Sequence, residues 1–324
     1  MEMIGAGRVH ELLDFEGLID ALQQAHRGGM PAQSDRLIYQ QPNPDGHPDT
    51  FIILPAWQPQ EGILAKLVTS FPNNKARHDL PTVNSLYVFI NAETGVPEAA
   101  IEGESMIFRK TSADSALGSR LLSRPDAESF LMIGAGGLAP YLVRAHLTAR
   151  PGLRRLTVWN RTRANAEAMA ARLAEEGIEI AVAEDLDAAV AEADIVCSAT
   201  MATEPHLKGR LLKPGAHVDL IGSFTPEMRE ADDDVLRRAS IFVDHRQTTT
   251  RSGEFLGPFA RGVITPGDVR ADYFELVQGR HPGRQSAREI TMLKNGGGSH
   301  IDYYVAKYLM DRHHGRAFST SCAS

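Results

Sequence analysis

A short glycine-rich turn, Gly134-Ala-Gly136-Gly-Leu-Ala139, carries the clearest chemical signal in this sequence, because it joins an apolar, strand-like run to a helical pattern. In such a turn the first glycine permits a tight bend, the second lets the backbone approach a pyrophosphate, and the final small residue lets helix and strand pack closely. Free amides at the helix start would then face the phosphates. This context favours a dinucleotide site over a purely structural turn. The expected contacts are Gly134, Gly136, Gly137, Leu138 and Ala139.

The residues after the second expected strand, 155–159, indicate which dinucleotide binds. A site that prefers NAD usually carries an acidic residue there, which holds the 2′-hydroxyl of the ribose. This chain has Asn160 instead, and Arg161 and Arg163 could bind a 2′-phosphate together with Thr162. Solvated arginines at a helix start are the alternative. The missing acid and the added arginines together favour NADP(H), with NAD(H) as the second choice.

Basic residues in the N-terminal third are the candidates for binding a substrate. Lys66 stands inside the apolar run 63–68, and a strand lysine with apolar neighbours either reaches water at an edge or turns into a site. Arg36 lies in an irregular stretch, and Lys110 follows Arg109 just before a helical pattern. Taken alone, each of these residues is more often a solvated surface charge.

The patterns around these residues describe two kinds of domain. Residues 37–101 read as short β-like runs, whereas after Arg124-Pro125-Asp126 strand and helix alternate, which predicts a parallel, doubly wound Rossmann sheet. Thr200 follows the fourth strand of that sheet, where it could touch the cofactor, although threonine is common at strand ends. Strands are expected at 129–133, 155–159, 179–183, 195–198, 217–220 and 241–243, and helices at 14–26, 111–122, 138–149, 164–176 and 299–312.

The expected fold class is therefore α/β, with a Rossmann domain at 123–290 that binds NADP(H). A discontinuous α+β domain at 1–122 and 291–324 would bind the substrate and form the dimer. The last helix follows Asn295-Gly-Gly-Gly298 and is expected to pack against the N-terminal half. These glycines either close over the site or act as a flexible linker.

Composition narrows the class of protein. The chain has 324 residues and a formal net charge of −7 without a long block of one sign, so neither nucleic acid nor an anionic membrane is expected as a partner. It has no apolar run long enough to span a bilayer and no signal-like N-terminus. Its two cysteines, Cys197 and Cys322, form neither a disulfide framework nor a zinc pattern, so no metal site is expected. A reducing cytoplasm fits best.

Several motifs together resemble the ornithine cyclodeaminase/μ-crystallin family. The matching residues are Gly62-Ile-Leu-Ala-Lys66-Leu-Val-Thr-Ser-Phe-Pro72, Glu93-Thr-Gly95, Lys110-Thr111 with Ser115-Ala-Leu117, Gly134-Ala-Gly136 and Trp159-Asn-Arg-Thr162. The resemblance implies a two-domain subunit, usually a homodimer built through its first domain, with substrate held between that domain and the Rossmann sheet. It also implies that Arg36, Lys66 and Lys110 contact the substrate carboxylate or the reacting nitrogen. Thr111 and Gly222 complete the expected cofactor contacts.

Two departures from the family pattern point to a branch within it. The family commonly has arginine where this chain has Lys110, which offers a point charge in place of a bidentate fork. Cyclodeaminases carry an aspartate after the fifth strand, where this chain has Phe224, and a phenyl ring cannot accept a proton. With Ala-Asp-Ser-Ala-Leu-Gly at 113–118, the chain looks most like the reductases of Δ1-pyrroline-2-carboxylate and Δ1-piperideine-2-carboxylate. Phe224 would then form an apolar wall against the substrate.

The hypothesis that follows is NAD(P)H-dependent reduction of a cyclic imino acid to L-proline or L-pipecolate. Arg36 and Lys110 would hold the carboxylate, and Lys66 would donate a proton to the nitrogen or only bind the carboxylate. The alternatives are another amino- or imino-acid dehydrogenase, such as one forming alanine or N-alkyl amino acids, and less strongly ornithine cyclodeaminase or a non-enzymatic binding protein. His217 at a strand start is expected to be structural, and Asp232-Asp-Asp234 to open a helix.

Overall fold

The computed structural model describes residues 1–33, 37–43, 46 and 48–319 and divides into two compact units. Unit 1 comprises Met1–Lys110 and Ser299–Ser324, and unit 2 comprises Thr111–Gly298. Arg36, one of the expected substrate contacts, lies outside the described residues, as does Cys322. None of the described helices is both long and apolar enough to cross a membrane.

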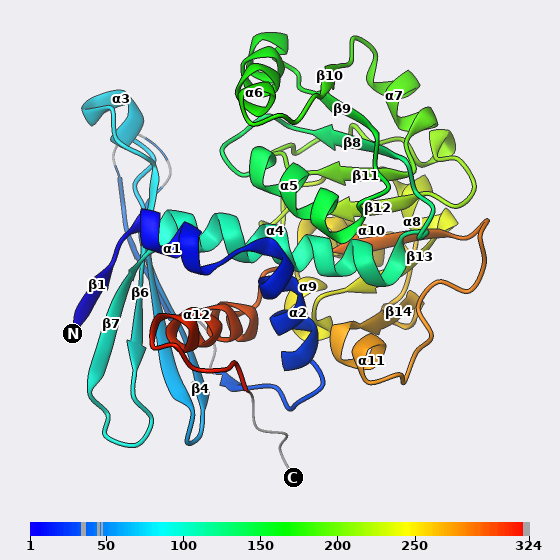
Figure 1. The fold of residues 1–324 in the computed structure, drawn as a ribbon. Coiled ribbons are helices and arrows are strands. Elements are labelled where there is room, and N and C mark those ends of the chain that lie inside the picture. Colours follow the sequence, from blue (N-terminus) through cyan, green and yellow to red (C-terminus); the bar gives the residue numbers. More distant parts are fainter. Residues whose placement is uncertain (34–36, 44–45, 47, 320–324) are drawn as a thin grey trace. The chain divides into compact units, whose positions relative to one another are not determined.

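Unit 1 is built on a sheet with the strand order β1-β7-β6-β5-β4-β2, and β3 also pairs with β4 (Figure 1). β1 runs parallel to β7, and the other pairings are antiparallel. The strands are β1 (Glu2–Ile4), β2 (Ala32–Gln33), β3 (Leu37–Gln41), β4 (Asp49–Gln58), β5 (Gly62–Ser70), β6 (Val83–Ile90) and β7 (Pro97–Glu102). The helices are α1 (Ala6–Leu12), α2 (Phe15–Ala25), α3 (Asn74–His78), α12 (Ser299–His313) and the first part of α4 (Gly103–Leu122).

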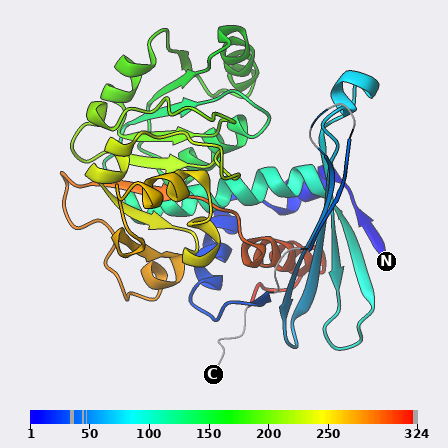
Figure 2. The same ribbon diagram turned by 180° about the vertical axis from the view of Figure 1, so that it is seen from behind.

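Helix α12 returns to the first sheet, as the sequence predicted, and contacts α2, β4 and β5. It lies on one face of the sheet, and no described helix of unit 1 covers the other face (Figures 1 and 2). Residues paired directly across neighbouring strands point to the same face. Lys66 is paired with Tyr87 on the α12 face, so Ala65 and its partner Val88 point away from α12. The strand register therefore decides which side chains meet the helix.

Helix α4 begins at Gly103, well before the expected start at residue 111. The carboxylate of Glu102 accepts hydrogen bonds from the amides of Glu104, at 2.8 Å, and Ser105, at 2.9 Å, and so caps the helix. The sequence pattern missed this first part because a glycine, a serine and three charged residues interrupt its apolar period.

Unit 2 contains eight strands in the order β10-β9-β8-β11-β12-β15-β13-β14, all of them parallel. The strands are β8 (Ser129–Ile133), β9 (Arg155–Trp159), β10 (Ala181–Val182), β11 (Ile195–Ser198), β12 (His217–Leu220), β13 (Ala239–Val243), β14 (Val269–Asp272) and β15 (Ile290–Lys294). The helices are α5 (Ala139–Ala149), α6 (Arg163–Glu175), α7 (Leu186–Glu192), α8 (Asp233–Arg238), α9 (Arg246–Thr249), α10 (Gly253–Ala260) and α11 (Tyr273–Val277), with short 3₁₀ turns at Gly209–Leu211 and Pro266–Asp268.

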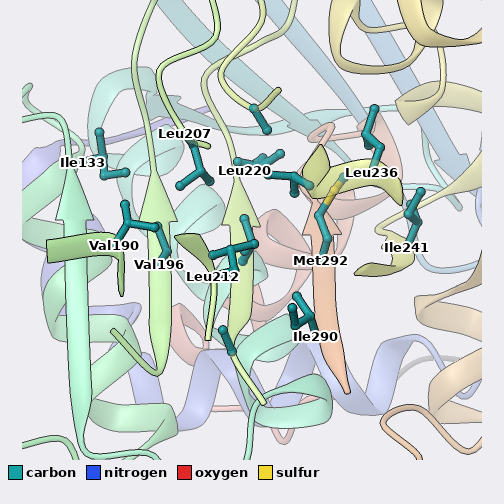
Figure 3. Packing of buried hydrophobic residues seen from close by; sticks show 14 of the residues in the cluster. Ile133, Val190, Val196, Leu207, Leu212, Leu220, Leu236, Ile241, Ile290 and Met292 are labelled. Carbon is teal, nitrogen blue, oxygen red and sulfur yellow. The ribbon is translucent and has the colours of Figure 1, made fainter. Parts of the chain in front are cut away.

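Helices cover both faces of this second sheet. Ile133, Val196 and Leu220 point into the core layer shown in Figure 3, which α7, α8 and α10 close. Their strand neighbours Met132 and Cys197 point into the opposite layer, closed by α5 and α6. Parallel strands buried on both faces and helices on each side form a doubly wound α/β sheet, so the expected fold class is confirmed.

The sequence analysis did not predict two strands of this sheet, β14 and β15. β15 lies between β12 and β13, although residues from 291 onward were expected in the first domain. A five-residue apolar run that is buried on both faces has no alternation to reveal it as a strand. The two compact units accordingly divide at 110/111, inside α4, and at 298/299, rather than at 122/123 and 290/291.

Candidate active site

The glycine-rich turn lies between β8 and α5, at the edge where the parallel strands of unit 2 end. Gly134 has a φ of +105°, a conformation that favours glycine, and a Cβ there would lie 2.6 Å from the carbonyl oxygen of Ala199. Gly136 is exposed, and a Cβ there would meet no atom within 4 Å. A side chain is therefore excluded at Gly134, whereas the space beside Gly136 is free of other atoms.

Backbone amides at the start of α5 are available to an anion. Among the described residues, no group accepts a hydrogen bond from the amides of Gly136, Gly137 or Leu138. The amide of Ala139 donates a hydrogen bond to the carbonyl of Gly136, and the methyl group of Ala139 packs in the core beside β8. Unpaired amides at the positive end of a helix bind phosphate, so the residues present fit the pyrophosphate of a dinucleotide.

Asn160, which follows β9, supports the glycine-rich turn. Its Oδ1 accepts a hydrogen bond from the amide of Ala135 at 3.2 Å, and its Nδ2 donates to the carbonyl of Thr162 at 2.9 Å. The side chain therefore joins two of the segments that were expected to contact the cofactor. It places no negative charge where a ribose 2′-phosphate would bind.

The two arginines after β9 differ in their surroundings. Arg163 forms ion pairs with Glu167, at 2.7 Å, and Glu184, at 3.2 Å. Arg161 is exposed, and no described residue pairs with its guanidinium. Since exposed ion pairs are weak, Arg163 could exchange a carboxylate for a phosphate, but Arg161 is the better candidate.

Thr200 and Gly222, at the ends of β11 and β12, are held together by one carboxylate. Glu230 accepts hydrogen bonds from the amide and hydroxyl of Thr200, at 2.8 and 2.9 Å, and from the amide of Gly222, at 2.6 Å. The hydroxyl of Ser198 donates to the same carboxylate at 2.6 Å. Glycine is required at 222, because a Cβ there would lie 1.8 Å from the carbonyl oxygen of Thr200. The two loops therefore form one polar unit beside the glycine-rich turn.

Buried charges lie beneath these loops. Burial raises the pKa of Glu230 to about 7, against the opposing effect of Lys294. Lys294, also fully buried, donates to the carbonyls of Leu220, Ile221 and Asn295. Glu254 accepts hydrogen bonds from the amides of Glu230 and Ala231. The sequence analysis did not predict any of these three charged residues. Only Lys294 gave a signal, because a lysine ends the largely apolar segment 290–294.

Thr111 and the segment after β15 are fixed to each other within unit 2. The carbonyl of Thr111 accepts a hydrogen bond from Nδ2 of Asn295 at 3.2 Å, and the same amide group contacts Oγ of Ser115 at 3.1 Å. Asp244 accepts hydrogen bonds from the amides of the two glycines that follow, at 2.9 and 2.7 Å. The glycine-rich segment after Asn295 is therefore anchored and does not act as a loose linker.

In unit 1 the structure brings the two described substrate candidates to one carboxylate. Asp302, on α12, has its Oδ1 at 3.5 Å from Nζ of Lys66 and at 3.2 Å from Nζ of Lys110. The hydroxyl of Tyr87 donates to the same oxygen at 3.0 Å. The side chains of both lysines are largely buried, at 12% and 4% exposure. Neither lysine is a solvated surface charge, and Asp302 was not anticipated from the sequence.

The surroundings of Lys66 weaken its hold on a proton. Burial, together with the nearby charge of Lys110, lowers the pKa of Lys66 to about 8 against the opposing effect of Asp302. The Lys66 ammonium also lies 5.1 Å from the centre of the Tyr87 ring. Two buried ammonium groups thus lie around one carboxylate oxygen, and such groups attract an anionic ligand.

The remaining sequence candidates have the following places. Phe224 lies on the loop after β12 and is 64% exposed, and its role as an apolar wall stays a prediction. His217 is buried, with Nδ1 at 2.9 Å from Oγ1 of Thr291, and burial lowers its pKa far below the usual value, which fits the structural role expected. Asp232 accepts from two amides at the start of α8, which confirms the helix start.

One group of metal-ligand type occurs among the described residues. Atoms of His146, Cys197 and Asp219 lie within 4.8 Å of one another in the core of unit 2. Cys197 donates a hydrogen bond to Asp219, which also contacts His146 at 3.3 Å. Burial and the Asp219 charge raise the pKa of the Cys197 thiol well above its usual value. Because metals bind the thiolate, we interpret the group as a hydrogen-bonded core cluster.

A Rossmann sheet with a free dinucleotide turn, and a second unit with a buried lysine pair, define a two-domain dehydrogenase-type protein. The chain belongs to the ornithine cyclodeaminase/mu-crystallin family, whose model matches residues 6–317. This confirms the family that the sequence motifs predicted.

Relatives in this family include named reductases. The chain is 42% identical, over 92% of both chains, to the Δ1-pyrroline-2-carboxylate reductase of Paracoccus denitrificans. It is 29% identical to the mouse ketimine reductase mu-crystallin, over 80% of this chain and 79% of the relative. The solved structure of Thermococcus litoralis Δ1-pyrroline-2-carboxylate reductase with NADH and L-proline superposes with a TM-score of 0.88 at 26% identity, covering 99% and 100% of the two chains.

Replacing Glu230 with glutamine tests whether the Thr200–Gly222 loops bind the cofactor. A glutamine would present an amino group to backbone and hydroxyl donors, so we expect a lower melting temperature and at least about tenfold weaker NAD(P)H binding, about 1.4 kcal/mol. Fluorescence titration of the cofactor measures this affinity. Glu227→Gln, on the exposed part of the same loop, is the control. Unchanged affinity in a folded Glu230→Gln would remove these loops from the cofactor site.

Proposed function

We propose that this chain is an NAD(P)H-dependent reductase of cyclic imino acids. It reduces Δ1-pyrroline-2-carboxylate to L-proline and Δ1-piperideine-2-carboxylate to L-pipecolate. The observation that carries this proposal is the buried pair of lysines around a single carboxylate oxygen, where two ammonium groups can bind a substrate anion. The 42% identity to a reductase of this reaction supports it.

Substrate and cofactor are assigned to different units in this proposal. Unit 2 binds the dinucleotide through the turn at 134–139, and unit 1 binds the imino acid and forms the dimer. Lys110 holds the substrate carboxylate by charge, together with Arg36 as the family resemblance implies. Binding of that carboxylate places a negative charge beside the two buried ammonium groups. A neutral amine lacking the carboxylate gains none of this energy, so the site selects α-imino acids.

Lys66 supplies the proton in this proposal. The bound cofactor provides the hydride that adds to C2 of the C=N bond. The ring nitrogen then takes up one proton, and Lys66, with a pKa of about 8, holds a transferable proton at neutral pH. As the ammonium gives up its proton, it becomes a neutral amine, which burial favours.

The test of this function is NADPH oxidation at 340 nm with Δ1-pyrroline-2-carboxylate, with pyruvate plus methylamine and ornithine as competing substrates. We expect rapid turnover of the cyclic imine alone. Lys66→Met should lower kcat by about 100-fold or more, because the proton donor is lost. Lys75→Met, at an exposed site of α3, is the control. An unchanged kcat with a raised KM in Lys66→Met would make Lys66 a binding residue.

We also infer a preference for NADP(H) over NAD(H). It is supported by the missing acid at Asn160 and by the exposed, unpaired guanidinium of Arg161. The ion pairs of Arg163 and the NADH bound to the Thermococcus litoralis relative weigh against it.

Replacing Arg161 with alanine separates these cofactors. We expect the KM for NADPH to rise about tenfold while the KM for NADH stays within twofold, because only NADPH carries the 2′-phosphate. Steady-state kinetics with both cofactors measure this, and Arg172→Ala, exposed at the other end of α6, is the control. An equal effect on both cofactors would show that Arg161 does not recognise the phosphate.

We further infer that the chain forms a homodimer through the sheet of unit 1. The sheet face opposite α12 carries three aligned rows of apolar side chains, which we name the apolar face: Ile53, Leu67 and Leu86; Pro55, Ala65 and Val88; Trp57, Ile63 and Ile90. No described helix of unit 1 covers it, and Trp57 is 51% exposed. Exposed apolar patches of this kind mark protein interfaces.

Trp57→Glu should convert the dimer to a monomer, because it places a charge within the apolar face. Size-exclusion chromatography with light scattering measures the mass. Leu256→Glu, at an exposed apolar position of unit 2, should leave the dimer intact. A wild-type mass of one chain would contradict the proposal. The cytoplasmic location expected from the cysteine content stays a prediction.

A further inference from the structure

Asp302 has an unusual set of contacts for a buried carboxylate. Its Oδ1 is shared by Lys66, Lys110 and Tyr87 at distances between 3.0 and 3.5 Å. Its Oδ2 is buried and has no hydrogen-bond partner among the described residues. The side chain is only 1% exposed. The described groups of the cluster come from four elements: Lys66 from β5, Tyr87 from β6, Lys110 from α4 and Asp302 from α12. The carboxylate of Glu102, at the end of β7, acts on Tyr87 as well.

A carboxylate placed only for stability would have both oxygens satisfied, because an unpaired buried acceptor is destabilising. The ion pair of Lys307 and Asp311, one lysine to one aspartate on the same helix, shows the ordinary arrangement. Asp302 instead serves two ammonium groups with one oxygen. This arrangement holds the two ammonium groups close together around one oxygen atom.

We propose that Asp302 is a positioning residue for imine reduction, holding Lys66 and Lys110 in place and keeping Lys66 protonated in the working pH range. The inference rests on the proposed function. Asp302 does not touch the reacting atoms and acts through the two lysines. Without its charge, Lys66 would still face the ammonium of Lys110 but would lose the effect of the Asp302 carboxylate, so it would release its proton at a lower pH.

The direction of the expected pH effect follows from the proposed mechanism, because Lys66 is active in its protonated form. In the wild type, kcat/KM for the imine should fall as the pH rises past about 8, as Lys66 loses its proton. Removing the negative charge of Asp302 lowers the pKa of Lys66 further. The alkaline limb of the profile should therefore move to lower pH.

Asp302→Asn keeps the shape and removes the charge. We expect the alkaline limb of kcat/KM to move down by at least one pH unit, with a loss of about tenfold or more at pH 8 and partial recovery near pH 6. The Glu102 carboxylate, which lies near Tyr87, remains in both proteins. A merely structural role would lower activity equally at every pH. Asp311→Asn, a buried aspartate on the same helix, should leave the limb in place.

If Asp302→Asn does not fold, Asp302→Glu provides the test. It keeps the charge on a longer side chain, so the limb should stay near the wild-type pH while kcat falls at least fivefold, because both lysines are displaced. Wild-type kcat and KM in this variant would overturn the positioning role, as would an unmoved limb in a folded Asp302→Asn. No turnover of any imine by the wild type would instead reject the proposed function itself.

Discussion

Two buried ammonium groups repel each other and lose their hydration, so they can lie together only where a carboxylate joins them. In unit 1 that carboxylate is Asp302, and it constrains the elements around it. β5 must hold a register that turns Lys66 toward α12, since a slip by one residue would turn it to the apolar face. α4 must place Lys110 within reach, and α12 must return from the other end of the chain.

Unit 2 uses a buried charge in the same way. Glu230 binds the loops after β11 and β12 to each other, and Lys294 lies beneath it against three backbone carbonyls. In both units the groups that we propose for ligand binding are fixed by a buried carboxylate, Asp302 in unit 1 and Glu230 in unit 2. The glycine-rich turn needs less support, because its amides are positioned by the backbone and by the start of α5.

The parts that could be predicted from the sequence are those with local signals. The first strands of the Rossmann sheet alternate with helices, and the Gly134 turn lies between a strand and a helix, so its place followed from neighbouring residues. β15 was missed because a short strand buried on both faces has no period, and its position between β12 and β13 depends on the whole sheet. Lys66 was noticed as a charge in an apolar run.

Asp302 and Glu230 gave no such signal, because a buried acid is recognised by its partners, and theirs are distant in the sequence. The contacts of these two acids also have functional consequences that a sequence motif does not reveal. In the proposed reaction, the negative charge of the substrate carboxylate would add to that of Asp302 and so raise the affinity of Lys66 for its proton. Departure of the product would lower that affinity again. The cluster that binds an anionic substrate would thereby keep Lys66 protonated up to a higher pH while that substrate is bound.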